Sequence, residues 1–154
     1  MPETVGGQMS APSDRYIVSA CLAGIPCRYD GGCSPFLPVL QLVENGQAIP
    51  VCPEQLGGLP TPRIPAEIAN GRVITREGTD VTEAFRHGAC EALRLAKEYG
   101  CTRAVLKARS PSCGCGPIYD GTFCRRLTEG QGIFARMLLE AGFTVDSEET
   151  FSLS

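Results

Sequence analysis

The sequence predicts an α/β fold in a single domain, and two observations lead to this prediction. Short apolar segments typical of buried strands alternate along the chain with longer segments of helical periodicity. The length of 154 residues is that of one domain, and the 43% hydrophobic and 20% charged residues are ordinary for a globular protein. We therefore expect one Rossmann-like domain over residues 15–154, with a mostly parallel sheet and helices on both faces, after a disordered tail over residues 1–14.

The first half of the chain supplies two strands and one helix. Residues 16–20 and 48–52 are short and apolar, as buried strands are. Between them a helix over about 34–45 begins at a Ser-Pro pair, which can act as N-cap and first-turn proline, and Gly46 stops it. Residues 53–66 contain four prolines and break every regular pattern, so we expect a long functional loop there.

The longest helix follows this loop. Residues 72–76 are expected to form a short edge strand. Asp80 can then cap the helix, and Glu83 completes a capping-box pattern three residues later. Apolar residues recur every three or four positions, and Gly100 ends the pattern.

The last third of the chain repeats the alternation. A strand over 102–107 leads into a loop over 108–122 that is dense in Ser, Pro, Gly and Cys. A helix over about 132–141 and a strand over 143–147 follow. Because strands and helices keep alternating, the sheet is predicted to be mostly parallel, with helices packed on its faces.

Three cysteine-bearing segments follow the ends of three predicted strands. Cys21 and Cys52 stand directly at strand ends, and the third strand runs into the segment 110–115, SPSCGC. The carboxyl ends of parallel strands share one edge of a sheet, where ligands bind, so these thiols are expected to converge. They predict a metal site, and we favour iron–sulfur chemistry with one open coordination position. The residues alone leave open whether Cys113 or Cys115 is the third ligand.

The remaining cysteines are harder to assign. Nine cysteines, an odd number, and no sign of export indicate reduced thiols rather than a disulfide scaffold. Cys27, Cys33 and Cys124 are candidates for a fourth ligand, a resolving thiol or bystanders. Cys90 and Cys101 lie on or just after a predicted helix, where we expect them to be packing residues.

The acid–base and binding residues are sought near the same edge. His87, the one histidine, lies in the middle of a predicted helix, so another general base is needed. Glu54 is best placed, two residues after Cys52 on a turn stiffened by proline. The hydroxyls of Ser110 and Ser112 can donate to a substrate or to a cluster sulfur. Four cations beside the cysteines would suit a phosphate or carboxylate: Arg28, Arg63, Lys107 and Arg109.

Charge and hydropathy exclude several classes of protein. A net charge of −3 argues against a large nucleic-acid surface, and no apolar run approaches the length of a membrane span. Residues 1–14 have neither a basic nor an apolar signal region, so we expect a cytoplasmic protein with a small-molecule partner. A non-catalytic zinc or iron–sulfur redox-sensor module is the alternative. The oligomeric state is left open.

Eight motifs within residues 16–150 resemble, in order, the thiouracil desulfidases, small bacterial iron–sulfur enzymes once classed as a family of unknown function. The motifs are VSACL at 18–22, CRYDGG at 27–32, VCPE at 51–54, GGLPTPR at 57–63, GTDVTEAF at 78–85, LK at 106–107, SPSCG at 110–114 and IYDGTF at 118–123.

This resemblance implies a cofactor and a set of roles. It implies a 4Fe-4S cluster held by Cys21, Cys52 and Cys113, with one iron open to the sulfur of a thiolated uracil. It also implies catalytic roles for Glu54 and Ser110. The expected substrate-binding residues are Lys107, Ser112, Arg28 and Arg63.

The resemblance also implies a hydrolase-type reaction that releases hydrogen sulfide without net electron transfer. Relatives that act on tRNA carry a further C-terminal domain, and this chain ends at Ser154 without one. We therefore expect a base or nucleotide as substrate, with 4-thiouridine monophosphate favoured because of the cationic loops. The sequence does not distinguish a 2-thiouracil substrate from a 4-thiouracil substrate.

Overall fold

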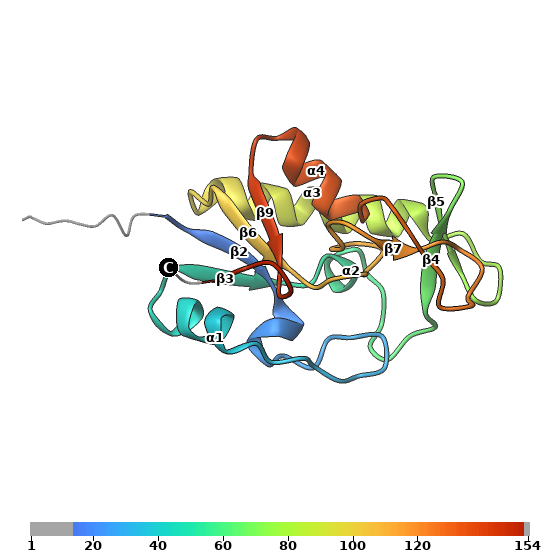
Figure 1. Ribbon diagram of the computed structural model, residues 1–154, viewed down its shortest axis with the longest axis horizontal. Coiled ribbons are helices and arrows are strands. Elements are labelled where there is room, and N and C mark those ends of the chain that lie inside the picture. The colour runs from blue at the N-terminus through green and yellow to red at the C-terminus, as the bar shows by residue number, and fades with distance from the viewer. Residues whose placement is uncertain (1–13, 153–154) are drawn as a thin grey trace, which may run out of the picture.

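The computed structural model describes residues 14–152, and its centre is a sheet of four parallel strands (Figure 1). The strand order is β3-β2-β6-β9. The strands are β2 (Tyr16–Ser19), β3 (Ala48–Val51), β6 (Arg103–Leu106) and β9 (Thr144–Ser147). The tail expected over residues 1–14 lies outside the described residues, apart from Asp14.

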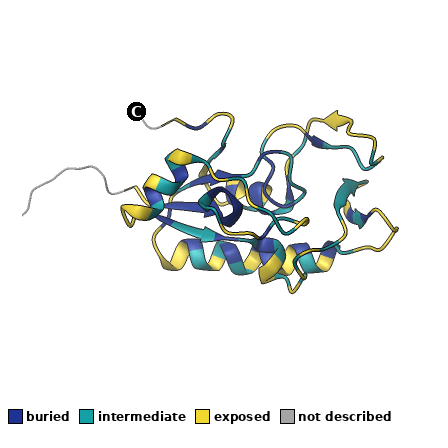
Figure 2. Ribbon diagram, turned by 90° about the horizontal axis from the view of Figure 1, so that it is seen from below, coloured by how far each residue is buried: buried dark blue, intermediate teal, exposed yellow. Residues whose placement is uncertain are grey.

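Helices cover both faces of this sheet, as predicted. Helix α1 (Leu37–Glu44) packs on one face, and α3 (Thr82–Glu98) and α4 (Ile133–Glu140) pack on the other. Alternate residues of the strands serve the two faces: Val18 packs with the α1 side and Ile17 with the α3 and α4 side. The buried residues therefore lie along the strands and on the helix faces turned toward them (Figure 2). No helix among the described residues is long and apolar enough to cross a membrane.

The order of the strands creates a crevice at one edge. The chain passes from β2 to β3 on one side, and then returns past β2 to β6 on its other side. The connections therefore switch direction between β2 and β6, and ligands of such sheets bind outside the carboxyl ends of the strands at that point. At this point the backbone N–H of Lys107, just after β6, donates to Ser19 Oγ at the end of β2, at 2.9 Å.

Two small hairpins lie beyond the same edge (Figure 1). The first pairs β4 (Ala66–Ala69) with β5 (Arg72–Thr75), and the second pairs β7 (Ile118–Tyr119) with β8 (Leu127–Thr128). Glu67 joins them, because its Oε1 accepts the backbone N–H groups of Gly121 at 3.0 Å and Phe123 at 3.1 Å. We call residues 66–76 and 118–128 the outer lobe. The expected edge strand over 72–76 belongs to this lobe and not to the central sheet.

Short helices occur where the sequence predicted loops. Cys21 lies in a 3-10 turn (Ala20–Ala23) directly after β2, and α2 (Pro53–Leu56) begins the proline-rich segment. Helix α1 starts three residues later than expected, because the backbone N–H groups of Ser34 and Phe36 donate to the carbonyls of the 3-10 turn. The chain there is held extended rather than helical.

The helix caps also differ from the predicted ones. The N-cap of α3 is Val81, and Asp80 acts from one residue earlier by accepting hydrogen bonds from the backbone N–H and the hydroxyl of Thr82. Glu83 does not complete a capping box, since it pairs with Arg86. The helix stops at Gly46, Gly100 and Gly142 are confirmed by left-handed backbone angles, with φ of 75°, 73° and 91°.

Candidate functional site

A cavity of about 400 Å³ opens between the carboxyl edge of the sheet and the outer lobe. Its wall includes all three cysteines that were expected to converge, and Cys27 with them. The lining thiols are those of Cys21, Cys27, Cys52 and Cys113. The cavity falls within the range of about 300–1,000 Å³ that is usual for small-molecule sites.

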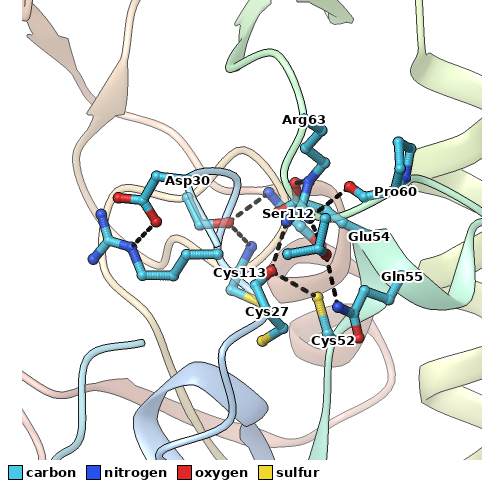
Figure 3. Close-up of polar contacts among 12 residues, drawn as sticks. Cys27, Asp30, Cys52, Glu54, Gln55, Pro60, Arg63, Ser112 and Cys113 are labelled. Atoms are coloured by element: carbon cyan, nitrogen blue, oxygen red, sulfur yellow. Dashed lines mark hydrogen bonds and ion pairs between the residues drawn. The ribbon is translucent and has the colours of Figure 1, made fainter. Parts of the chain in front are cut away.

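Cys21 and Cys52 are placed by the first turn after their strands. The Cys21 carbonyl accepts the backbone N–H of Ser34 at 2.9 Å, which fixes the 3-10 turn. Cys52 is the N-cap of α2 and is followed by a proline in the first helical turn. Its thiol donates to the Cys27 carbonyl at 3.8 Å (Figure 3).

Cys113 is placed by a tight loop and by the start of α4. Ser110 Oγ accepts the backbone N–H groups of Ser112 and Cys113, both at 3.0 Å. A Cβ on Gly132 would lie 2.4 Å from the Ser112 carbonyl oxygen, so only glycine lets α4 approach this closely. Cys113 lines the cavity, whereas Cys115 is not among its lining residues.

Three of the cavity thiols, those of Cys27, Cys52 and Cys113, have raised pKa values. Burial raises the pKa of Cys113 to about 12, although the hydroxyls of Ser19 and Ser112 act in the opposite direction. The neighbouring Cys21 thiol is the largest influence that raises the pKa of Cys27, to about 11. The Cys27 thiol and burial together raise the pKa of Cys52. A bound metal group would therefore displace protons from these sulfurs.

The donor set fits an iron–sulfur cluster, because the cavity wall supplies cysteine sulfurs and irons of such clusters are held by cysteine thiolates. Within residues 14–152, no group of three or more His, Cys, Asp or Glu side chains gathers closely enough to hold one metal ion. Thiols spaced around a cavity suit a group of several irons. Ser112, which the sequence predicted to bind substrate, is fully buried and is not among the residues that line the cavity. Its hydroxyl has no hydrogen-bond partner among the described residues and acts to lower the pKa of the neighbouring Cys113 thiol.

Glu54 forms a nearly buried ion pair with Arg63 (Figure 3). The Arg63 Nε atom lies 2.9 Å from Glu54 Oε1, and the side chains are 7% and 17% exposed, respectively. The other two guanidinium nitrogens of Arg63 donate to the carbonyls of Cys27 and Pro60 and to Thr61 Oγ1. Burial raises the pKa of Glu54, and Arg63 only partly offsets that effect. Arg63, expected to bind substrate, thus points all three nitrogens at protein acceptors.

The other three predicted cations also line the cavity, and each has a carboxylate partner. Arg28 Nε lies 3.7 Å from Asp30 Oδ1, and Arg28 Nη1 donates to Ser34 Oγ at 2.6 Å. Lys107 Nζ lies 2.6 Å from Glu148, and Arg109 lies 2.7 Å from Glu149.

Glu148 connects the ends of β6 and β9. It accepts the backbone N–H of Ala108 at 2.8 Å in addition to its bond with Lys107. Burial alone would raise the pKa of Glu148, but these two donors outweigh it, and the pKa is lowered. The carboxylate is therefore ionised and holds the Lys107 ammonium at the cavity wall.

Sequence reasoning missed the part of the wall that the outer lobe supplies. Tyr119, Phe123, Arg76 and Arg125 all line the cavity. They lie in short hairpins, and nothing in their local sequence shows that these fold back over the sheet edge. Among the other cysteines, Cys101 is buried in the core as expected. The expectation for Cys90 was wrong, since it is exposed on α3, as Cys33 and Cys124 are exposed in loops.

Comparison with known proteins assigns the family. The sequence profile described as 2-thiouracil desulfurase matches residues 16–150. This chain belongs to that family. In this member of the family, four predicted site residues line one cavity: Cys21, Cys52, Cys113 and Glu54.

Two individual proteins support the assignment. The chain is 43% identical over 142 residues to the uncharacterized protein YbbK of Bacillus subtilis strain 168, a match that covers 86% of this chain and 94% of YbbK. It is 44% identical to a solved structure described as the 4Fe-4S-dependent thiouracil desulfidase TudS. That likeness has a TM-score of 0.84 and covers 90% of this chain and 93% of the other. The resemblance inferred from the motifs and the α/β fold are both confirmed.

Proposed function

We propose that this protein is a thiouracil desulfidase that exchanges the sulfur of a thiolated uracil for oxygen. The ring C=S group and one water give C=O and hydrogen sulfide, and no electron is gained or lost overall. The observation that carries the proposal is the cavity in which the thiols of Cys21, Cys52 and Cys113 meet the carboxylate of Glu54. Family membership and the likeness to a 4Fe-4S-dependent desulfidase support it.

Cys21, Cys52 and Cys113 are the residues that would hold a 4Fe-4S cluster. With three protein ligands one iron would stay open, and the group would supply a soft Lewis acid that polarises the carbon–sulfur bond. We propose that the buried Ser112 hydroxyl, which has no other partner, would donate to the Cys113 thiolate when that sulfur binds iron. Ser110 fixes the Cys113 loop through two backbone N–H groups.

Glu54 moves the protons of the reaction. Its pKa is raised by burial, so the carboxyl group exchanges protons nearer to neutral pH than an exposed glutamate would. It accepts a proton from the attacking water and later returns it to the departing sulfur. Arg63 acts through Glu54 as a positioning residue, because its Nε bond fixes the carboxylate at the cavity wall.

The remaining polar groups of the wall bind and orient the substrate. The Ser110 hydroxyl can donate its own proton while its oxygen accepts from the backbone, and we propose that it orients the attacking water or stabilises the negative charge that develops as the C=S bond opens. Lys107 and Arg28 each keep N–H groups that their protein partners do not use. We propose that these groups contact the substrate and that a nucleotide, 4-thiouridine monophosphate, is preferred over the free base.

The experiment uses protein purified without oxygen. The visible absorption of a 4Fe-4S cluster and turnover without an electron donor, measured as sulfide and uracil formed, would support the proposal. The substrates compared are 2-thiouracil, 4-thiouracil, 4-thiouridine and its monophosphate. Bound zinc without iron, or a cluster that supports no turnover on any of them, would refute it and favour a metal-binding sensor module.

A further inference from the structure

Ser112 carries the one buried side-chain oxygen of residues 14–152 that has no hydrogen-bond partner. The residue is 0% exposed and does not line the cavity, so neither bulk water nor a bound substrate supplies that partner. A polar group that stays unpaired inside a protein costs stability, and such a group calls for an explanation. A partner that is present only in the metal-loaded protein would explain it.

Ser19 presents a second buried hydroxyl from a different element. It is the last residue of β2, is 3% exposed and lines the cavity. Its oxygen accepts the backbone N–H of Lys107 at 2.9 Å. That bond uses one lone pair of the oxygen, and the proton of the hydroxyl remains available for donation.

Both hydroxyls act on the sulfur of Cys113. Burial raises the pKa of this thiol, while hydrogen bonds from Ser19 and Ser112 lower it, because they favour the ionised sulfur. Cys52, in contrast, receives its hydrogen bond from a backbone N–H, that of Gln55. The donors to Cys113 are therefore side chains, which a substitution can remove without changing the backbone.

We propose that Ser19 and Ser112 act through Cys113: their hydroxyls donate to its thiolate in the cluster-loaded protein, and this raises the reduction potential of the cluster. The inference rests on the proposed function and deepens it, because it gives two residues a measurable effect on the bound group. Hydrogen bonds to sulfur are among the features by which a protein sets the potential of an iron–sulfur cluster. They withdraw electron density from the thiolate, so the irons become better acceptors for the sulfur of a substrate. In this role the two serines are positioning residues.

The first test is a redox titration of the cluster-loaded protein. The midpoint potential should be more negative in Ser19→Ala and in Ser112→Ala than in the parent, and most negative in the double variant. Ser19→Thr keeps the hydroxyl and should restore the potential of the parent. Ser147→Ala is the matched control, since Ser147 is 2% exposed and pairs with the backbone N–H of Glu149 but does not line the cavity. A double variant with the potential of the parent would overturn the proposal.

Resonance Raman spectra in H2O and D2O test whether the effect passes through hydrogen bonds to sulfur. Deuterated hydroxyls should shift the iron–thiolate stretching bands of the parent, and the shift should be smaller in the double variant. A potential that changes while the isotope shift stays the same would contradict the proposed route.

Stability of the cluster-free protein tests Ser112 in another way. Its hydroxyl has no partner there, so Ser112→Ala should leave the free energy of unfolding unchanged or raise it. Ser147→Ala removes a paired hydroxyl and should be less stable than the parent. In the loaded protein, Ser112→Ala should lose iron to a chelator faster than the parent does. A cluster-free Ser112→Ala protein as destabilised as Ser147→Ala would show that the hydroxyl has a partner within the fold, and the proposal would fail.

The outcome is separable from that of the proposed function. If the loaded protein desulfurises a thiolated uracil, but the potentials of parent and double variant agree, the role of the two serines is wrong and the activity stands. If no thiolated uracil reacts, but the potential falls when the hydroxyls are removed, the activity is wrong and the role of Ser19 and Ser112 stands.

Discussion

Glu54 has a raised pKa although the Arg63 guanidinium lies 2.9 Å from its carboxylate. Burial disfavours the charged carboxylate, whereas Arg63 favours it. The effect of burial is the larger one, so the pKa of Glu54 is raised. Neither effect follows from the motif VCPE alone, because Arg63 is nine residues away. Burial and Arg63 together therefore determine the pKa of Glu54, which lies two residues after the proposed ligand Cys52.

Glu54→Gln should lower kcat by about a hundredfold or more, because the amide keeps the shape of the side chain but cannot accept a proton. The variant should keep its iron content and still bind uridine monophosphate. Steady-state kinetics on 4-thiouridine monophosphate measure the effect, with Glu44→Gln on the exposed surface of α1 as control. Turnover close to that of the unaltered protein would remove Glu54 from the mechanism.

The three ligand assignments make a separate prediction. Replacing Cys21, Cys52 or Cys113 with Ala would remove one of the three proposed ligands, so each variant should fail to assemble a stable cluster. Iron and sulfide analysis after anaerobic reconstitution measures this. Cys90→Ala, which alters an exposed thiol on α3, should load as fully as the parent. A Cys113→Ala protein with full iron content would instead point to Cys115.

Sequence reasoning found the cavity residues that directly follow a strand end, and it missed the cavity residues that lie on the two small hairpins. Cys21, Cys52 and Glu54 were expected at the carboxyl edge, and all three line the cavity. Arg76 and Arg125 reach it only because the outer lobe folds over the edge. That arrangement depends on side-chain contacts such as those of Glu67, which join segments more than 50 residues apart and have no local signal.

At the scale of elements, two glycines let α2 pack against α3 with their backbones in contact. A Cβ on Gly88 would lie 1.7 Å from the Pro53 carbonyl oxygen, and one on Gly57 would lie 2.0 Å from that of Ala84. This contact explains a helix that the sequence did not predict. Four residues that begin with proline form no stable helix alone, and packing on α3 holds them in that conformation.

Gly88→Ala should therefore destabilise the protein, although alanine in a helix is ordinarily favoured over glycine by about 1 kcal/mol. The clash with backbone should cost about 1–3 kcal/mol and displace the turn that carries Cys52 and Glu54. Urea unfolding and iron content measure the two effects. His87→Ala, at the exposed neighbouring position, should be neutral or stabilising. A more stable Gly88→Ala protein would show that α2 and α3 are not in close contact.

The start of α3 gives a prediction about pH. Hydrogen bonds from the Thr82 hydroxyl and N–H, and then from Arg72, lower the pKa of Asp80 to about 2. The unfolded value is about 3.9, so ionised Asp80 stabilises the fold above that pH, and the contribution is lost as the pH falls toward 2. Asp80→Asn should be less stable than the parent at about pH 6, with the difference reduced near pH 3. Urea midpoints measure it, with Glu83→Gln as control, and a pH-independent difference would contradict it.

At the scale of the whole molecule, alternation of strands and helices was enough to predict a parallel sheet covered on both faces. It was not enough to predict the strand order, since the side on which each strand is added depends on contacts between distant segments. The order β3-β2-β6-β9 brings Ser19 and Lys107 together at the point where the connections reverse. That point is where the cavity lies.

The covered faces also determine what should happen when the cluster is removed. The core under α1 and the core under α3 and α4 are built from buried apolar side chains, among them Leu42, Val105, Phe134 and Leu138. These contacts do not need a ligand in the cavity. Small proteins that depend on a metal in place of a hydrophobic core unfold when the metal is chelated. This protein has its own hydrophobic cores and should keep its secondary structure.

Removal of the cluster should still lower the melting temperature, because the proposed ligands Cys21, Cys52 and Cys113 would tie together the segments that follow β2, β3 and β6. For a chain of this size, each kcal/mol lost lowers Tm by about 2–4 °C. Far-UV circular dichroism and thermal unfolding before and after anaerobic chelation measure the two effects. The Cys21→Ala variant, which should bind no cluster, serves as control because its Tm should not respond to chelation. Loss of the far-UV signal from the parent protein at room temperature would show that the fold depends on its metal, and the two apolar cores would then be insufficient to maintain it.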